Sequence, residues 1–134
     1  MRAASPPLAY VYDRCATANL AMLEMRLSAI DEYVTERGWS LAGRYVDYGD
    51  DALTNPDRRP QFDALIREMG EAPSRAERLC LLYDWGRLSH AAEHRQVFAR
   101  RVLMAGGRLE TIEGEVVRMT DNLAGRLTSR PVVA

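Results

Sequence analysis

Stretches typical of buried β-strands alternate along this chain with stretches typical of amphipathic helices. Strand-like runs cover residues 8–12, 41–46, 79–83 and 108–112, and helical patterns cover residues 18–37, 61–69 and 90–105. In the first helical pattern Leu20, Leu23 and Leu27 recur at intervals of three and four residues, and Gly38 is placed to end the helix. Such alternation predicts an α/β fold with a mainly parallel sheet and helices on both faces.

The length of 134 residues fits one compact domain. We expect a flexible N-terminus over residues 1–7, the domain itself over 8–115, and an irregular or partly helical tail over 116–134. The net charge of −1 gives no general attraction to nucleic acid. All 18 basic residues other than histidine are arginine, which indicates a GC-rich, bacterial source.

Cellular location is predicted from the cysteines and from the apolar runs. Cys15 and Cys80 both fall in strand-like stretches, which predicts reduced, buried thiols rather than a disulfide. The chain has no signal-peptide pattern and no apolar run approaching ~20 residues. We therefore expect a cytoplasmic protein without a membrane contact.

Charged residues gather where the predicted strands end. Asp13 and Arg14 follow the first strand, Asp47 follows the second, and Asp84 to Arg87 follow the third. A long loop over residues 47–55, closed by Pro56, is placed to bring Arg59 to the same edge. Because ligands of open parallel sheets bind at the carboxyl ends of the strands, this edge is the predicted site.

Three short motifs lie at or near this edge: Tyr-Asp-Arg-Cys-Ala-Thr at 12–17, Asp-Arg-Arg-Pro at 57–60 and Gly-Arg-Leu-Ser at 86–89. In their order and spacing, these motifs resemble the catalytic domain of serine recombinases, the resolvase/invertase family. The resemblance extends from Leu8 to about Glu113. It implies a three-layer resolvase-like fold with about four to five strands, and a reaction in which a serine attacks a DNA phosphodiester while arginines stabilise the charge.

Carried over residue by residue, the resemblance implies an anion or phosphate pocket formed by Arg14, Asp47, Arg59 and Arg87. The nucleophile is missing, because the family's Arg-x-Ser-Thr reads Arg-Cys-Ala-Thr here and Ala16 has no oxygen.

Two further positions depart from the family pattern. Gly86 replaces an acidic residue and His90 replaces an arginine. We therefore expect a pseudoenzyme that acts by binding or regulation in a DNA recombination context.

Neighbouring side chains offer no evident replacement for the serine. Thr17 and Cys15 flank Ala16, and successive side chains of an extended strand point in opposite directions. Ser89 matches a serine that the family does not use as its nucleophile. The expected partner is an active recombinase or another protein, DNA contact is expected only weakly or through that partner, and a homodimer is an open alternative.

Other features of the sequence are compatible with different functions. Asp13, Asp47 and Asp84 could form an acidic rim for a magnesium-dependent enzyme, although the arginines on the same edge would compete for the carboxylates. Residues 90–94 fit the His-x-x-Glu-His zinc pattern, but a solvated helix face is the simpler interpretation. No cofactor or metal is expected, and a self-assembling structural module is the remaining alternative.

Overall fold

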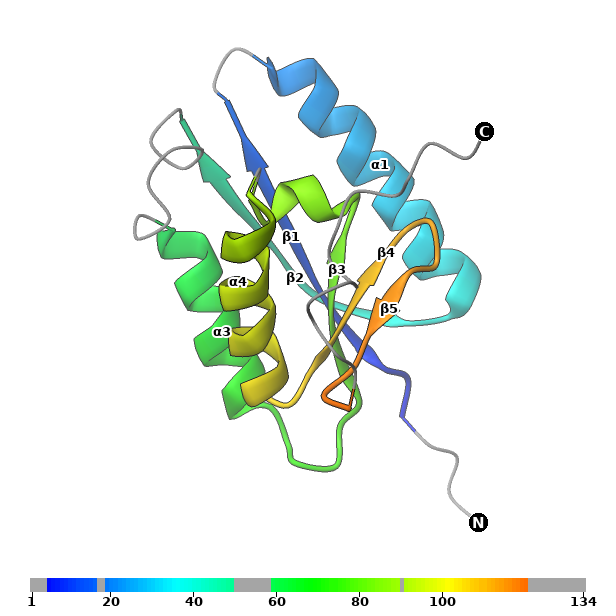
Figure 1. Ribbon diagram of the computed structural model, residues 1–134. Helices are drawn as coiled ribbons and strands as arrows, with labels where there is room; N and C mark the ends of the chain where they lie inside the picture. The colour runs from blue at the N-terminus through cyan, green and yellow to red at the C-terminus, as the bar shows by residue number, and fades with distance from the viewer. Residues whose placement is uncertain (1–4, 17–18, 50–58, 90, 121–134) are drawn as a thin grey trace, which may run out of the picture.

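The computed structural model describes residues 5–16, 19–49, 59–89 and 91–120, and shows a five-stranded sheet between layers of helices (Figure 1). The strands are β1 (Leu8–Cys15), β2 (Ser40–Tyr48), β3 (Arg78–Leu82), β4 (Arg108–Thr111) and β5 (Val116–Val117), in the order β2-β1-β3-β4-β5. The helices are α1 (Leu20–Arg37), α3 (Pro60–Glu71), the short 3-10 helix η2 (Trp85–Arg87) and α4 (Ala92–Met104). The predicted α/β class, with a mainly parallel sheet, is confirmed.

Strand β1 lies in the middle of the sheet and organises the strands around it. It pairs in parallel with β2 along its whole length, from Leu8 opposite Ser40 to Cys15 opposite Tyr48. Its pairing with β3 is also parallel but covers only residues 8–11. The last four residues of β1 therefore lack a β3 neighbour, and this gap between the strand ends is where η2 and its arginine are placed.

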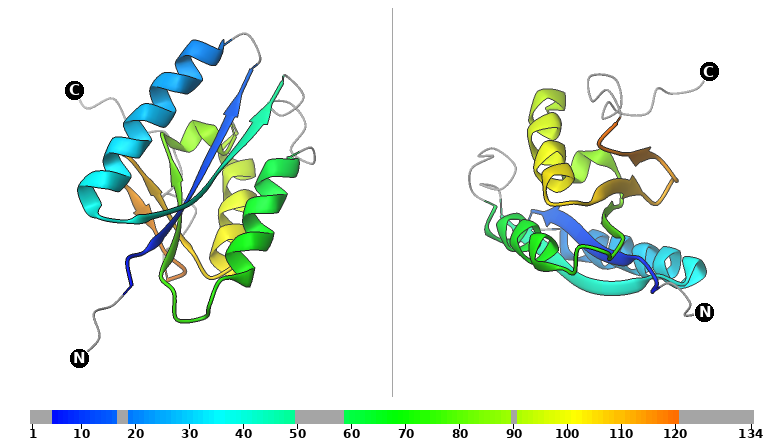
Figure 2. Two further views of the ribbon diagram at one scale, coloured as in Figure 1. Left: turned by 180° about the vertical axis from the view of Figure 1, so that it is seen from behind. Right: turned by 90° about the horizontal axis from the view of Figure 1, so that it is seen from below.

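Helix α1 covers one face of the sheet (Figure 2). Its buried Ile30, Tyr33 and Val34 pack against residues of β1 and β3 that point to that face. Gly38 ends the helix in the left-handed conformation, at φ 67°, and its N–H donates to the carbonyl of Thr35. Gly suits this position because it has no Cβ to clash.

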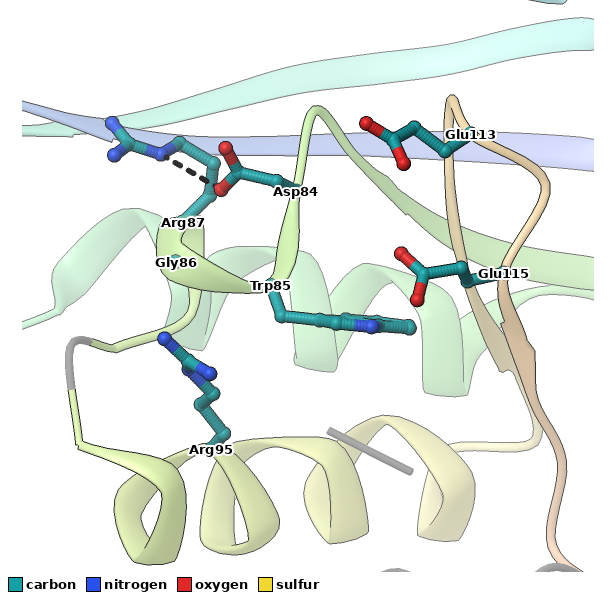
Figure 3. Close-up of a pocket in the computed structure, with 7 residues that line it drawn as sticks. All are labelled: Asp84, Trp85, Gly86, Arg87, Arg95, Glu113 and Glu115. Carbon is teal, nitrogen blue, oxygen red and sulfur yellow. Dashed lines mark ion pairs between the residues drawn. The ribbon is translucent and has the colours of Figure 1, made fainter. Parts of the chain in front are cut away.

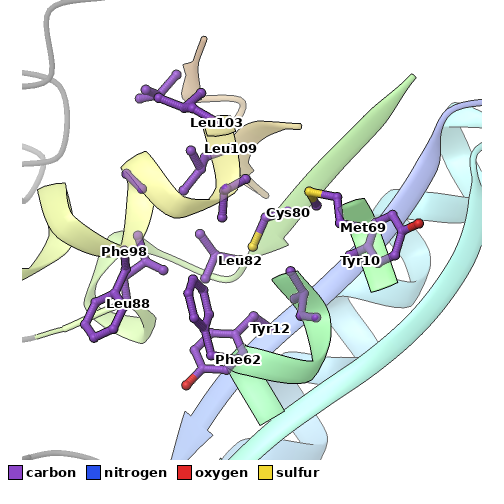
Figure 4. Close-up of a cluster of buried hydrophobic side chains, with 14 of the residues drawn as sticks. Tyr10, Tyr12, Phe62, Met69, Cys80, Leu82, Leu88, Phe98, Leu103 and Leu109 are labelled. Carbon is purple, nitrogen blue, oxygen red and sulfur yellow. The ribbon is translucent and has the colours of Figure 1, made fainter. Parts of the chain in front are cut away.

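Helices α3 and α4 cover the opposite face, where the larger hydrophobic core lies (Figure 4). Phe62 is at its centre and meets Tyr12 and Phe98 edge-to-face, with ring centroids 5.1 Å and 5.3 Å apart. Leu65 and Met69 continue the buried stripe of α3. Successive side chains of β1 point to opposite faces of the sheet, so Tyr10 and Tyr12 face this core while Ala9 and Val11 face α1.

The end of β1 and the end of the sheet differ from those expected from the sequence. β1 continues to Cys15 rather than stopping at Tyr12, because its pairing with β2 persists through polar residues. The sheet also extends past residue 115, since Val116–Val117 turn back at Gly114 and pair antiparallel with β4. A stretch expected to be irregular or helical therefore contributes an edge strand. In the described part of the chain, no helix is both long and apolar enough to span a bilayer.

Candidate functional site

Arg14 is the central side chain of the site and is completely buried. It lies on the face of β1 opposite to Asp13, and its Nε and Nη2 donate to the carbonyl oxygen of Gly86 at 3.2 Å and 2.8 Å. Its Nη1 has no hydrogen-bond partner within the described residues. A buried guanidinium with an open donor is costly, and it marks a place where an acceptor would be favourable.

Arg59 immediately precedes α3, and its side chain reaches the same region. Its guanidinium lies 4.1 Å above the ring of Phe98 and donates through Nη1 to the carbonyl of Leu88 and, at 3.5 Å, to the hydroxyl of Tyr12. Only 2% of the residue is exposed. Its Nε has no hydrogen-bond partner in the described ranges, so a second donor of the cluster is open.

Arg87 approaches from η2 and completes the cluster. Its Nη1 donates to the carbonyl of Arg14 at 3.1 Å and lies 3.9 Å from an Asp13 carboxylate oxygen. Its buried Nε is 3.5 Å from Asp84 Oδ1, too poorly placed to form a hydrogen bond there or with any other described group. The predicted grouping of the three arginines is therefore present at the carboxyl end of the sheet.

These guanidinium groups repel one another. The pKa of Arg14 falls to about 10, first because of burial and then because of the positive charges of Arg59 and Arg87. Arg14 still carries its charge at neutral pH. An anion placed among the three groups would satisfy open donors and relieve the repulsion, which makes the cluster suited to a phosphate or another oxyanion.

A pocket of about 290 Å³ opens beside Ala16. It is lined by Arg14, Cys15, Ala16, Asn19, Met22, Arg26 and Arg87. Arg59 does not line it, but its positive charge lowers the pKa of Arg14, which does. Cys15 was expected to point away from Ala16, but β1 ends at Cys15, so the alternation of an extended strand no longer applies between the two residues.

Asp47 was predicted as part of the anion site, and the structure gives it a structural setting instead. Its Oδ1 and Oδ2 accept the backbone N–H groups of Gln61 and Phe62, at 2.9 Å and 3.1 Å, at the start of α3. Oδ2 also accepts the hydroxyl of Tyr12 at 2.8 Å. The carboxylate thus caps a helix from a neighbouring strand.

Arg26 is a residue that the sequence analysis did not identify. It projects from α1 and forms a two-pronged ion pair with Asp13, at 2.7 Å and 2.8 Å, in a buried setting. The signal available in the sequence was an arginine among the apolar positions of a helix. The ion pair with Arg26 explains how the charged side chain of Asp13 can be completely buried.

The aspartate rim considered for magnesium does not come together. Asp13 is held by Arg26, Asp47 by the amides of α3, and the more exposed Asp84 lies beside Arg87. Within the described residues, no group of three or more His, Cys, Asp or Glu is arranged to hold a metal ion. The geometry gives no support to the magnesium alternative.

A second pocket of about 290 Å³ lies on the other side of Arg87 (Figure 3). Its lining is more acidic, with carboxylates of Asp84, Glu113 and Glu115 around the indole of Trp85. Gly86 forms part of the wall, and a Cβ built there would lie 3.0 Å from Asp84 Oδ1. An acidic side chain at this position would therefore require Asp84 to move.

Several positions named from the sequence lie outside the described residues: Thr17, His90, residues 50–55 of the predicted loop, Pro56, and positions 57 and 58 of the Asp-Arg-Arg-Pro motif. Ser89 is described, is buried, and its Oγ accepts the N–H of Ala91 at 3.2 Å. It does not line the pocket beside Ala16.

Comparison with known proteins gives matches in structure but none in sequence. No protein-family model and no curated protein matches the chain. The N-terminal catalytic domain of TP901-1 integrase is similar, at 19% identity and a TM-score of 0.66, over 81% of this chain and 80% of that chain. A resolvase family site-specific recombinase from Streptococcus pneumoniae is similar at 17% identity and a TM-score of 0.68, over 87% and 79%.

A third similar structure is the C-terminal catalytic domain of ISC1926 TnpA, an IS607-like serine recombinase. It is 16% identical, with a TM-score of 0.64, over 78% of this chain and 69% of that chain. Two of the three solved structures are named as recombinases and the other as an integrase, and all three matches cover most of this chain. The chain therefore has the fold of serine recombinase catalytic domains.

Proposed function

We propose that this protein is a catalytically silent serine-recombinase-like domain that binds an oxyanion, in the first place a phosphate of nucleic acid, without cutting it. It acts by binding or regulation in a DNA recombination context. A protein partner, with an active recombinase as the first candidate, brings it to DNA, which the domain alone holds weakly.

The observation that carries this proposal is the set of open donors at the arginine cluster. Nη1 of Arg14, Nε of Arg59 and Nε of Arg87 are buried and lack hydrogen-bond partners in the described ranges. Native proteins satisfy nearly all such groups, so a cluster of open ones indicates a missing acceptor. Oxyanions supply several acceptors and a compensating charge at once.

The lack of a hydroxyl at Ala16 supports the silent role. Ala16 stands at the pocket and has no hydroxyl. The hydroxyl of Tyr12 donates to Asp47, and burial, together with the negative charge of Asp47, raises the pKa of Tyr12 far above its usual value. A tyrosine held in this state is a poor nucleophile, because its phenolate is disfavoured.

Anion binding is the first test. Titration with inorganic phosphate, followed by calorimetry at low ionic strength, is expected to show saturable binding. Arg87→Gln is expected to weaken it about tenfold, because one charge-assisted hydrogen bond is lost. Arg44→Gln is the matched control, since Arg44 is exposed on β2 and pairs with Asp31. Equal affinities in the two variants would argue against the proposed pocket.

Restoring the nucleophile tests whether the domain is silent for the stated reason. Ala16→Ser is expected to form a covalent protein–DNA adduct on a nicked or suicide substrate when combined with Gly86→Asp and His90→Arg, whereas the unaltered protein forms none. The readout is a band that resists denaturation. An adduct with the unaltered protein would refute the silent role.

The three substitutions are best added stepwise, because one of them has a structural cost. A Cβ at position 86 lies within 3.0 Å of Asp84 Oδ1 and places two carboxylates side by side. Asp84 is half exposed, so it can turn toward water. The variant with Ala16→Ser alone separates the missing hydroxyl from the other two positions.

A further inference from the structure

The thiol of Cys15 lies in the wall of the pocket beside Ala16. Cys15 is the last residue of β1, and its Sγ donates weakly to the carbonyls of Ala16 and Asn19, at 3.1 Å and 3.4 Å. Only 1% of the residue is exposed, and Cys15 is among the residues that line this pocket. A reagent that reacts with this sulfur must first fit into a cationic space.

The charge of that space is set by arginines that outnumber the acids. Arg14, Arg26 and Arg87 all line the pocket. Asp13 neutralises Arg26 through the two-pronged ion pair, whereas no carboxylate in the described part of the chain is hydrogen-bonded to Arg14. Arg14 is also fully buried, and its Nη1 lacks a hydrogen-bond partner among those same residues. The surplus positive charge selects anions.

Cys80 provides the contrast within the same chain. It is fully buried in the core beneath α3 and α4, lines neither pocket, and burial raises its pKa far above the usual value for a thiol. Thiolate is the reactive form, so Cys80 is protected by both chemistry and access. Cys80 therefore serves as the unreactive reference thiol in the same chain.

We propose that Cys15 is a covalent modification site for small anionic disulfides, whose carboxylate binds at the arginines before the disulfide reaches the sulfur. This rests on the anion pocket of the proposed function. Cys15 loses its proton to water, its sulfur attacks one sulfur of the disulfide, and the other half leaves as a thiolate. The products are a mixed disulfide at Cys15 and one free thiol.

The modified state would change what the pocket can hold. The attached half carries its own carboxylate into the space between Arg14 and Arg87, where the free oxyanion would otherwise bind. Modification and phosphate binding are therefore mutually exclusive, and a thiol reductant restores the empty pocket. Oxidising conditions with anionic disulfides then turn off oxyanion binding reversibly.

The test uses a charge series of small disulfides on the unaltered protein: dithiodipropionate, hydroxyethyl disulfide and cystamine. Modification of Cys15 and Cys80 is followed separately by mass spectrometry of peptides. Each rate is divided by the rate of the same reagent with a small unstructured thiol, which removes differences in leaving group. The normalised rate at Cys15 is expected to be about tenfold higher for the anionic than for the cationic reagent, and Cys80 is expected to remain unmodified.

Variants and a competitor identify the pocket as the cause. Phosphate is expected to slow modification by dithiodipropionate, Arg87→Gln to reduce the charge preference and Arg87→Lys to keep most of it. Phosphate binding is measured in parallel by calorimetry. If the protein binds phosphate but Cys15 is not modified, or is modified at the same normalised rate by all three reagents, this inference is overturned and the proposed function is not. Absence of phosphate binding overturns the proposed function, and a charge preference that Arg87→Gln leaves unchanged excludes Arg87 as the residue that selects the anion.

Discussion

Replacing Asp13 with alanine is expected to destabilise the fold by about 3–5 kcal/mol, because the guanidinium of Arg26 is then left buried without its counter-ion. The pair is close, at 2.7 Å and 2.8 Å, and the Asp13 side chain is completely buried. Breaking one half of such a pair costs far more than the pair itself contributes. Urea unfolding followed by circular dichroism measures the change as a shift in midpoint.

An exposed ion pair between α1 and β2 supplies the control. Arg44 and Asp31 are also 2.7 Å apart, but both side chains are nearly half exposed. Asp31→Ala is expected to cost about 0–1 kcal/mol. The double variant Asp13→Leu with Arg26→Met should recover most of the lost stability. If Asp13→Ala cost no more than Asp31→Ala, the buried pair would not be the element that joins α1 to β1.

Replacing Asp47 with alanine is expected to destabilise the fold by about 2–4 kcal/mol, as the sum of a lost helix cap and an orphaned hydroxyl. Its carboxylate accepts the N–H groups of Gln61 and Phe62 and the hydroxyl of Tyr12. After substitution, the buried Tyr12 hydroxyl loses its 2.8 Å acceptor, and the start of α3 loses a negative charge. Thermal and urea unfolding both measure this loss.

Asp63→Ala is the matched control for this variant. Asp63 lies in the first turn of the same helix but is exposed, where it pairs with Arg101 at 2.7 Å. Its loss should cost less than about 1 kcal/mol. Phosphate affinity should change little in folded Asp47→Asn. A variant with normal stability and no phosphate binding would instead place Asp47 in the anion site, as the family resemblance implies.

The sequence predicted the fold class well because the strongest local signals agreed with the tertiary structure. The apolar runs and the helical spacing around Leu23 and Ile30 specify buried faces, and these faces decide the layers. The grouping of Arg14 with Arg87 followed from the general rule that strand ends converge. Strand ends were less predictable, since β1 continues through Asp13 and Arg14 only because β2 pairs with it.

What the sequence could not predict are contacts between distant residues. Arg26 looked like one charge on a helix, and only packing of α1 on β1 places it against Asp13. Asp47 was interpreted through its strand-end position, but α3 folds back so that its first amides meet the carboxylate. Cys15 enters the pocket because the strand stops there. Each case depends on how two elements pack against each other, and the spacing of apolar residues along the sequence carries no information about that packing.

The pairing of β1 also sets the order in which the protein can be assembled during synthesis. Residues 8–48 contain β1, α1 and β2, paired along the full length of β1, so this unit can close while the rest of the chain is still being made. Arg14, however, finds its acceptor on Gly86, 72 residues later. We therefore expect that in the nascent chain the strand–helix–strand unit forms first. The guanidinium of Arg14 can bond to the carbonyl of Gly86 only after η2 has been synthesised.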